Sequence, residues 1–85
     1  MPRIVLRSPV GIRKRRGELI RRYRLARGLA LEDVAPIVGT DVGSLSRIER
    51  GHRDPSLHQL DRLVEHLGIP YTLVSTRRLR AAAGV

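Results

Sequence analysis

The side chains best suited to selective hydrogen bonding and apolar contact stand at outward positions of a predicted helix in the middle of the chain. Arg47 can donate two hydrogen bonds to the O6 and N7 atoms of guanine, a contact that contributes about 1–3 kcal/mol of discrimination. Val42 can touch a thymine methyl group, and Ser44 can bond a base or a phosphate. The candidate base-contacting residues are Val42, Gly43, Ser44 and Arg47. The alternative for Arg47 is a phosphate contact or a solvated side chain.

These residues belong to a segment, LEDVAPIVGTDVGSLSRIERG at residues 31–51, whose apolar spacing predicts two short helices joined by a turn at Gly39. Ala35 is small where the two helices would cross, and Asp41 is a good N-cap for the second. Pro36 costs about 3 kcal/mol inside an ordinary helix, so we expect a kink or a tightened first turn with the motif retained. Such a helix-turn-helix can place its second helix in the DNA major groove.

Further helices are predicted on both sides of this motif. One should run from about Ile12 to Arg27 and be stopped by Gly28. Another should begin at Ser56, with Gln59 completing a capping box, and end at Gly68. The domain organisation is therefore predicted as an arm at 1–11, a helix-turn-helix domain at 12–70 and a tail at 71–85.

Two terminal segments have the composition of strands. RIVLR at residues 3–7 is interpreted as a short strand or an ordered arm. Residues 71–76, YTLVST, are rich in β-branched side chains and favour a strand over a fifth helix. The two segments could pair within one subunit or across a dimer, which makes the tail a candidate dimerisation segment.

The net charge of +9 over 85 residues points to a polyanionic partner. Residues 1–28 hold ten basic groups and one acidic group, whereas residues 29–70 hold four basic and seven acidic groups. The flanks of the motif, more than the motif itself, would attract phosphate. No apolar run of membrane-spanning length and no cysteine occur, so a cytoplasmic protein is expected.

Residues 17–69 resemble the Cro and phage-repressor helix-turn-helix family, often called XRE. The resemblance runs through GELIRRYRLARGLALEDVA, the turn at Gly39-Thr40, SRIERG and HRDPSLHQLDRLVEHLGI. It implies an all-α, compact four- to five-helix domain like that of lambda repressor. It also implies a sequence-specific transcriptional regulator, in particular a repressor, that binds double-stranded operator DNA as a homodimer and needs no cofactor.

The resemblance also assigns roles to individual residues. Arg24 and Glu49 match an ion pair that joins the first and third helices, the alternative being two separate exposed charges; Ala35 and Gly39 are structural. Leu31 stands where relatives carry a DNA-contacting Gln, and Ala30 replaces the usual Ser or Thr cap, so that contact is in doubt. Together with the basic first helix, the predicted contacts to the DNA backbone are Thr40, Ser46, Arg50, His52, Arg53, Arg13, Lys14, Arg15 and Arg16.

Two other functions compete with operator binding. An antitoxin would form a stable complex with the product of a neighbouring gene, and a protein-interaction module would keep the fold without contacting bases. An enzyme is disfavoured, because the three histidines have no cysteine beside them and no metal-binding spacing. No catalytic or metal-binding residue is therefore predicted.

Overall fold

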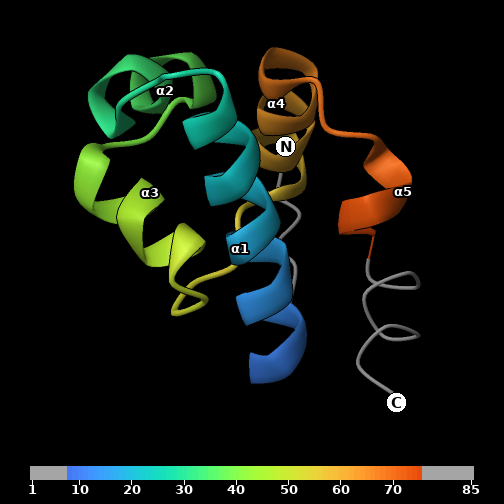
Figure 1. Ribbon diagram of the computed structural model, residues 1–85. Coiled ribbons are helices and arrows are strands. Elements are labelled where there is room, and N and C mark those ends of the chain that lie inside the picture. The colour runs from blue at the N-terminus through green and yellow to red at the C-terminus, as the bar shows by residue number, and fades with distance from the viewer. Residues whose placement is uncertain (1–7, 76–85) are drawn as a thin grey trace.

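The computed structural model describes residues 8–75, which form five helices. They are α1 (Val10–Ala26), α2 (Leu31–Val38), α3 (Val42–Glu49), α4 (Leu57–Leu67) and α5 (Tyr71–Val74). Figure 1 shows α2 and α3 on one side of α1 and α5 on the other. The predicted all-α, four- to five-helix architecture is confirmed for these residues, and the predicted strand at 3–7 lies outside them. No helix among residues 8–75 is long and apolar enough to cross a membrane.

A single apolar cluster holds the five helices together. Its buried side chains come from every helix and include Ile20 of α1, Val34 of α2, Leu45 of α3, Leu63 of α4 and Val74 of α5. The predicted 3.6-residue stripes of α2, α3 and α4 therefore form one common core.

The turn between α2 and α3 has the conformation that its residues favour. Gly39 has a φ of 80°, in the left-handed region that an L side chain rarely adopts. The Thr40 N–H then donates to the Ala35 carbonyl at 3.0 Å, which closes the end of α2. Ala35 is buried, as predicted for the small residue at which the two helices would cross. Pro36 lies on the exposed side of α2, and the helix continues past it to Val38.

The amino-terminal ends of α2 and α4 are capped differently. Ser56 and Gln59 form the predicted capping box of α4, at 3.0 and 3.1 Å, and Gly68 ends that helix in the left-handed conformation. At α2, Ala30 has no side-chain oxygen, but its N–H donates to Asp33 Oδ2 at 2.8 Å. Asp33 thus supplies one of the two hydrogen bonds of a capping box, and the other would need a side-chain oxygen at position 30.

The strand predicted at residues 71–76 is wrong for residues 71–74, which form α5. Pro70 begins this single turn, and the Leu73 N–H bonds the Pro70 carbonyl at 2.9 Å. The helical turn places Val74 in the core with no exposed surface. Burial of one apolar side chain outweighs the weak helix propensity of four residues.

Helix α1 contacts α3 through a glycine. A Cβ atom on Gly17 would collide with the carbonyl oxygens of Ile48 and Glu49, so only glycine permits this approach of the two backbones. The approach places the carboxyl-terminal end of α3 directly against the middle of α1.

Candidate nucleic-acid interface

Helix α3 has one buried face and one exposed face. Leu45 and Ile48 are fully buried beneath it, whereas Val42, Gly43 and Arg47 are exposed. Val42 retains 41% of its surface although it is apolar. Three of the four predicted base-contacting residues therefore lie together on the outer face of α3. This helix lies at the left of Figure 1, below α2.

Ser44 does not share this exposed position, which corrects the prediction that it contacts a base. The residue is 94% buried, and its hydroxyl is bonded on two sides within the protein. The Ser44 hydroxyl donates to Asp41 Oδ2 at 3.1 Å and accepts a hydrogen bond from Arg53 Nη1 at 3.0 Å. The sequence predicts Ser44 among the outward positions of this helix, but its hydroxyl instead joins the cap of α3 to the loop that follows the helix.

Asp41 is the predicted N-cap of α3. Its Oδ1 accepts the Ser44 N–H at 2.7 Å. This bond and the bond from the Ser44 hydroxyl lower the pKa of Asp41, and the charge of Arg47 lowers it further. The exposed acid at the start of α3 is consequently ionised at neutral pH and has both a capping role and an electrostatic one.

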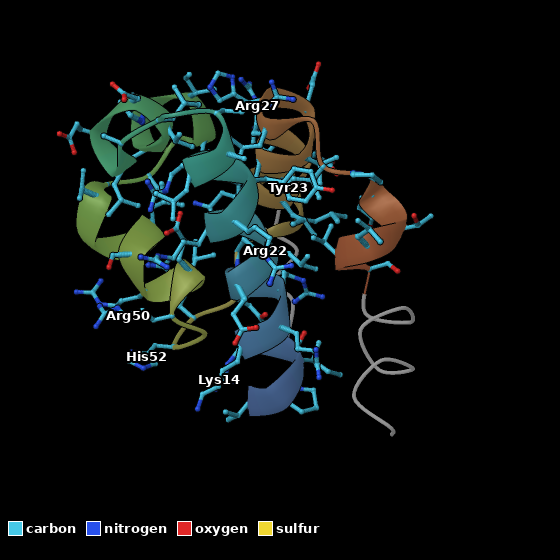
Figure 2. The ribbon with its side chains drawn as sticks, viewed as in Figure 1. Lys14, Arg22, Tyr23, Arg27, Arg50 and His52 are labelled. Carbon is cyan, nitrogen blue, oxygen red and sulfur yellow. The ribbon has the colours of Figure 1, made fainter. Side chains whose placement is uncertain are left out.

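A cationic rim lies beyond the carboxyl-terminal end of α3, formed by Lys14, Arg50 and Arg53 with the imidazole of His52 beside them. All four side chains are exposed. Figure 2 shows Lys14, Arg50 and His52 at the same end of the molecule. The 50–53 loop packs closely against α1 at Gly51, since a Cβ atom there would lie 2.6 Å from Lys14 Cγ. The predicted phosphate-contacting residues of α1 and of the 50–53 loop are thus adjacent where Lys14 meets Gly51.

Two arginines of α1 have internal partners instead. Arg16 is 99% buried; its guanidinium bonds Asp54 Oδ1 at 2.9 Å, the Val74 carbonyl at 3.0 Å and the Ser8 hydroxyl at 3.1 Å. Burial lowers the pKa of Arg16, and the Asp54 carboxylate opposes that shift. The prediction that Arg16 contacts phosphate is therefore corrected, because its charge is enclosed. Arg13 is half-buried and donates to the carbonyls of Ser8 and Gly51 at 3.0 and 3.1 Å.

The remaining predicted backbone contacts differ in exposure. Arg15 is exposed on α1, whereas Thr40 and Ser46 are half-buried beside α3. Leu31, at the position where a DNA-contacting Gln was expected from the resemblance, packs against the apolar core. Arg22 of α1 and Arg27, directly after that helix, lie away from Arg50 and His52 in Figure 2.

The ion pair between Arg24 and Glu49 is confirmed. Arg24 Nε and Nη2 donate to the two carboxylate oxygens at 2.7 and 2.9 Å, and both residues are buried. The hydrogen bonds to Glu49 raise the pKa of Arg24. A third bond, from Nη1 to the Leu29 carbonyl at 2.7 Å, ties the pair to the segment before α2. The pair therefore fixes α2 and α3 relative to α1.

Sequence reasoning missed three residues that position this surface. Gly17 permits the contact of α1 with α3, Asp54 neutralises Arg16, and Asp33 caps α2. The spacing of Asp33, three residues after Ala30, was the available signal for the cap. The other two roles depend on residues 31 to 38 positions apart in the chain, and no local pattern marks them.

Comparison with known proteins identifies the domain. A family model described as helix-turn-helix matches residues 20–74. The transcriptional regulator ClgR of Mycobacterium tuberculosis is 33% identical over 58 residues, which is 68% of this chain and 52% of the relative. The chain thus spans about half the length of the curated relatives that it matches.

Solved structures give the same result. The restriction-modification controller protein C.AhdI from Aeromonas hydrophila has a TM-score of 0.65 and 31% identity, covering 73% of this chain and 94% of that one. The clp gene regulator ClgR from C. glutamicum has a TM-score of 0.70 and 26% identity, covering 92% of this chain and 97% of that one. The chain belongs to the helix-turn-helix family, and its fold is that of the XRE-type DNA-binding regulators.

Proposed function

We propose that the chain is a sequence-specific double-stranded DNA-binding transcriptional regulator, a repressor that acts in the cytoplasm by occupying an operator. The outer face of α3, formed by Val42, Gly43 and Arg47, would enter the major groove. The cationic rim would hold the phosphates beside that groove. This division between base contacts and backbone contacts is the usual one in protein–DNA interfaces.

One observation carries the proposal. The outer face of α3 exposes an apolar side chain and a guanidinium, while cations stand just beyond the carboxyl-terminal end of the helix. A helix bound only to other protein elements would have no need of the adjacent cations. The functions of the relatives, a transcriptional regulator and a clp gene regulator, support the same assignment.

We further propose that two copies bind one operator. Half-sites on one face of a duplex would lie about 34–36 Å apart. Helix α5 and the tail beyond it are the candidates for joining the copies, because Tyr71 of α5 keeps 48% of its surface exposed. Sedimentation with and without DNA would measure the stoichiometry.

The test is a fluorescence titration of the purified chain against DNA selected by it from a random duplex library, and against random DNA. At about 150–200 mM salt, specific binding should exceed random binding by roughly 10³-fold or more. Failure to enrich any sequence, with equal affinity for all duplexes, would refute sequence-specific binding and leave a protein-interaction module on the same fold.

A further inference from the structure

The exposed acid at the start of α3 lies beside the exposed guanidinium near its end. A Cβ atom built on Gly43 would lie 3.3 Å from Asp41 Oδ1 and 4.0 Å from Arg47 Nη2. The two charged groups therefore flank one point, the bare backbone of Gly43. Arg47 reaches this point because it stands four residues after Gly43, and long helical side chains lean towards the amino-terminal end.

Gly43 makes this arrangement possible. Glycine inside a helix costs up to about 1 kcal/mol relative to alanine, and its φ here is ordinary, so backbone conformation does not require it. What its missing side chain provides is space on the outer face of α3. A long side chain at position 43 would occupy the place of the Arg47 guanidinium and would screen it from Asp41.

Asp41 is itself fixed. Ser44 donates both its N–H and its hydroxyl to the carboxylate, at 2.7 and 3.1 Å, and Arg53 donates to the same hydroxyl. A carboxylate held by two bonds to a buried residue offers a stationary negative charge. The exposed side chain of Arg47 lies within the field of that charge.

We propose that Asp41 is the positioning residue for Arg47, and that Gly43 keeps the path between them open. This inference rests on the proposed function, in which Arg47 contacts guanine. Asp41 would hold the Arg47 guanidinium over the amino-terminal half of α3, the half that contacts base edges in helix-turn-helix complexes. It would also disfavour a phosphate partner for Arg47, because a phosphate there would meet the carboxylate.

The contribution of Arg47 to specificity would then depend on three residues, of which only Arg47 itself contacts the guanine. Asp41 contributes by limiting the orientations of a long side chain before DNA arrives, so less conformational freedom is lost on binding. Gly43 contributes by the absence of a side chain.

The test uses Asp41→Asn, because asparagine caps helices as well as aspartate does and keeps an oxygen for the Ser44 N–H. Selected DNA carrying guanine or 7-deazaguanine at each position reports contacts to N7. For the wild-type chain, one position should lose about fivefold or more in affinity, the low end of a bidentate contact. Arg47→Ala should abolish that loss.

Asp41→Asn should reduce the 7-deazaguanine penalty to less than half while raising affinity for random DNA. Glu32→Gln is the matched control, since it removes one exposed negative charge from the first turn of α2. This control should raise the affinities for selected and for random DNA by the same factor and leave the 7-deazaguanine penalty unchanged. Gly43→Gln should reduce the penalty as Asp41→Asn does.

An Asp41→Asn chain that keeps the full 7-deazaguanine penalty would overturn the positioning role and leave the proposed function intact. Circular dichroism at the assay temperature would confirm that each variant is folded. A wild-type chain that shows no penalty at any guanine, yet binds its selected site, would remove Arg47 as a guanine contact and the positioning role with it. Failure of the selection itself would count against the proposed function.

Discussion

Arg16 of α1 and Asp54 of the loop before α4 form an ion pair, 2.9 Å between Nη1 and Oδ1, with side chains that are 1% and 5% exposed. Asp54 directly follows Arg53 of the cationic rim in the chain. The four consecutive basic residues at positions 13–16 do not form one exposed surface. Lys14 and Arg15 are exposed, whereas Arg16 faces the interior.

Replacing Arg16 should destabilise the fold without a specific effect on DNA binding. Arg16→Ala leaves the Asp54 carboxylate buried without its cation, which typically costs about 3–5 kcal/mol. Urea unfolding measures the loss. Arg15→Ala is the matched control, and its free energy of unfolding should change by less than about 0.5 kcal/mol. Equal stability of the two variants would contradict the enclosed ion pair.

Replacing Arg24 should also be costly, by about 3–5 kcal/mol in the free energy of unfolding, because Glu49 would keep its buried charge. The double variant Arg24→Met with Glu49→Met removes both charges and should recover part of that loss. A double-mutant cycle in urea gives the interaction free energy. Additive effects of the two single substitutions would show that the groups do not interact.

Gly17→Ala should lower stability by about 1–3 kcal/mol, the typical cost of an extra methyl group in a packed contact. The new methyl group would meet the backbone carbonyls of α3, which cannot rotate away as a side chain could. Gly11→Ala is the control on the same helix, because nothing lies near its Cβ position. There alanine should stabilise the helix, and thermal unfolding compares the two.

Lys14 should contribute to binding through phosphate alone. Lys14→Gln should weaken binding to selected and random DNA by the same factor, and the slope of log K against log salt should fall by about 1. Arg22→Gln, on the same helix but away from the rim, should leave the slope unchanged. A loss confined to the selected site would mean that Lys14 contacts a base.

Acid should weaken the cap of α3. The pKa of Asp41 is lowered in the fold, chiefly by the Ser44 N–H. Its contribution to stability is therefore complete above the ordinary aspartate pKa of about 3.9 and is lost as pH falls through the lower folded value. Urea unfolding at about pH 7 and about pH 3 should show a smaller pH-dependent loss for Asp41→Asn than for the wild type. The same loss in both would show that other carboxylates account for it.

The helix caps and the turn of the motif could be predicted from the sequence, because each depends on residues close together in the chain. The Ser56–Gln59 box, the turn at Gly39 and the Asp41 cap each depend on residues within five positions of one another. The pairing of Arg24 with Glu49 followed from family resemblance instead. Side-chain direction at the edge of a stripe was harder to predict, which is why Ser44 was placed on the outer face.

The errors in α1 and α5 share one physical cause. A run of arginines looks like a uniformly solvated cationic face, and a β-branched segment such as YTLVST looks like a strand. Arg16 and Val74 meet in the interior, however, where the guanidinium bonds the Val74 carbonyl at 3.0 Å. The Val74 carbonyl is one of the acceptors that the buried guanidinium needs, and no pattern within either segment records a partner 58 positions away.

The guanidinium of Arg16 joins Ser8, Asp54 and Val74, three segments that share no secondary structure. Breaking this junction would release the start of α1, the loop before α4 and α5 together, so these segments should open as one cooperative unit in amide hydrogen exchange. A ligand that holds the 50–53 loop would then also protect the amides of α5, on the other side of α1.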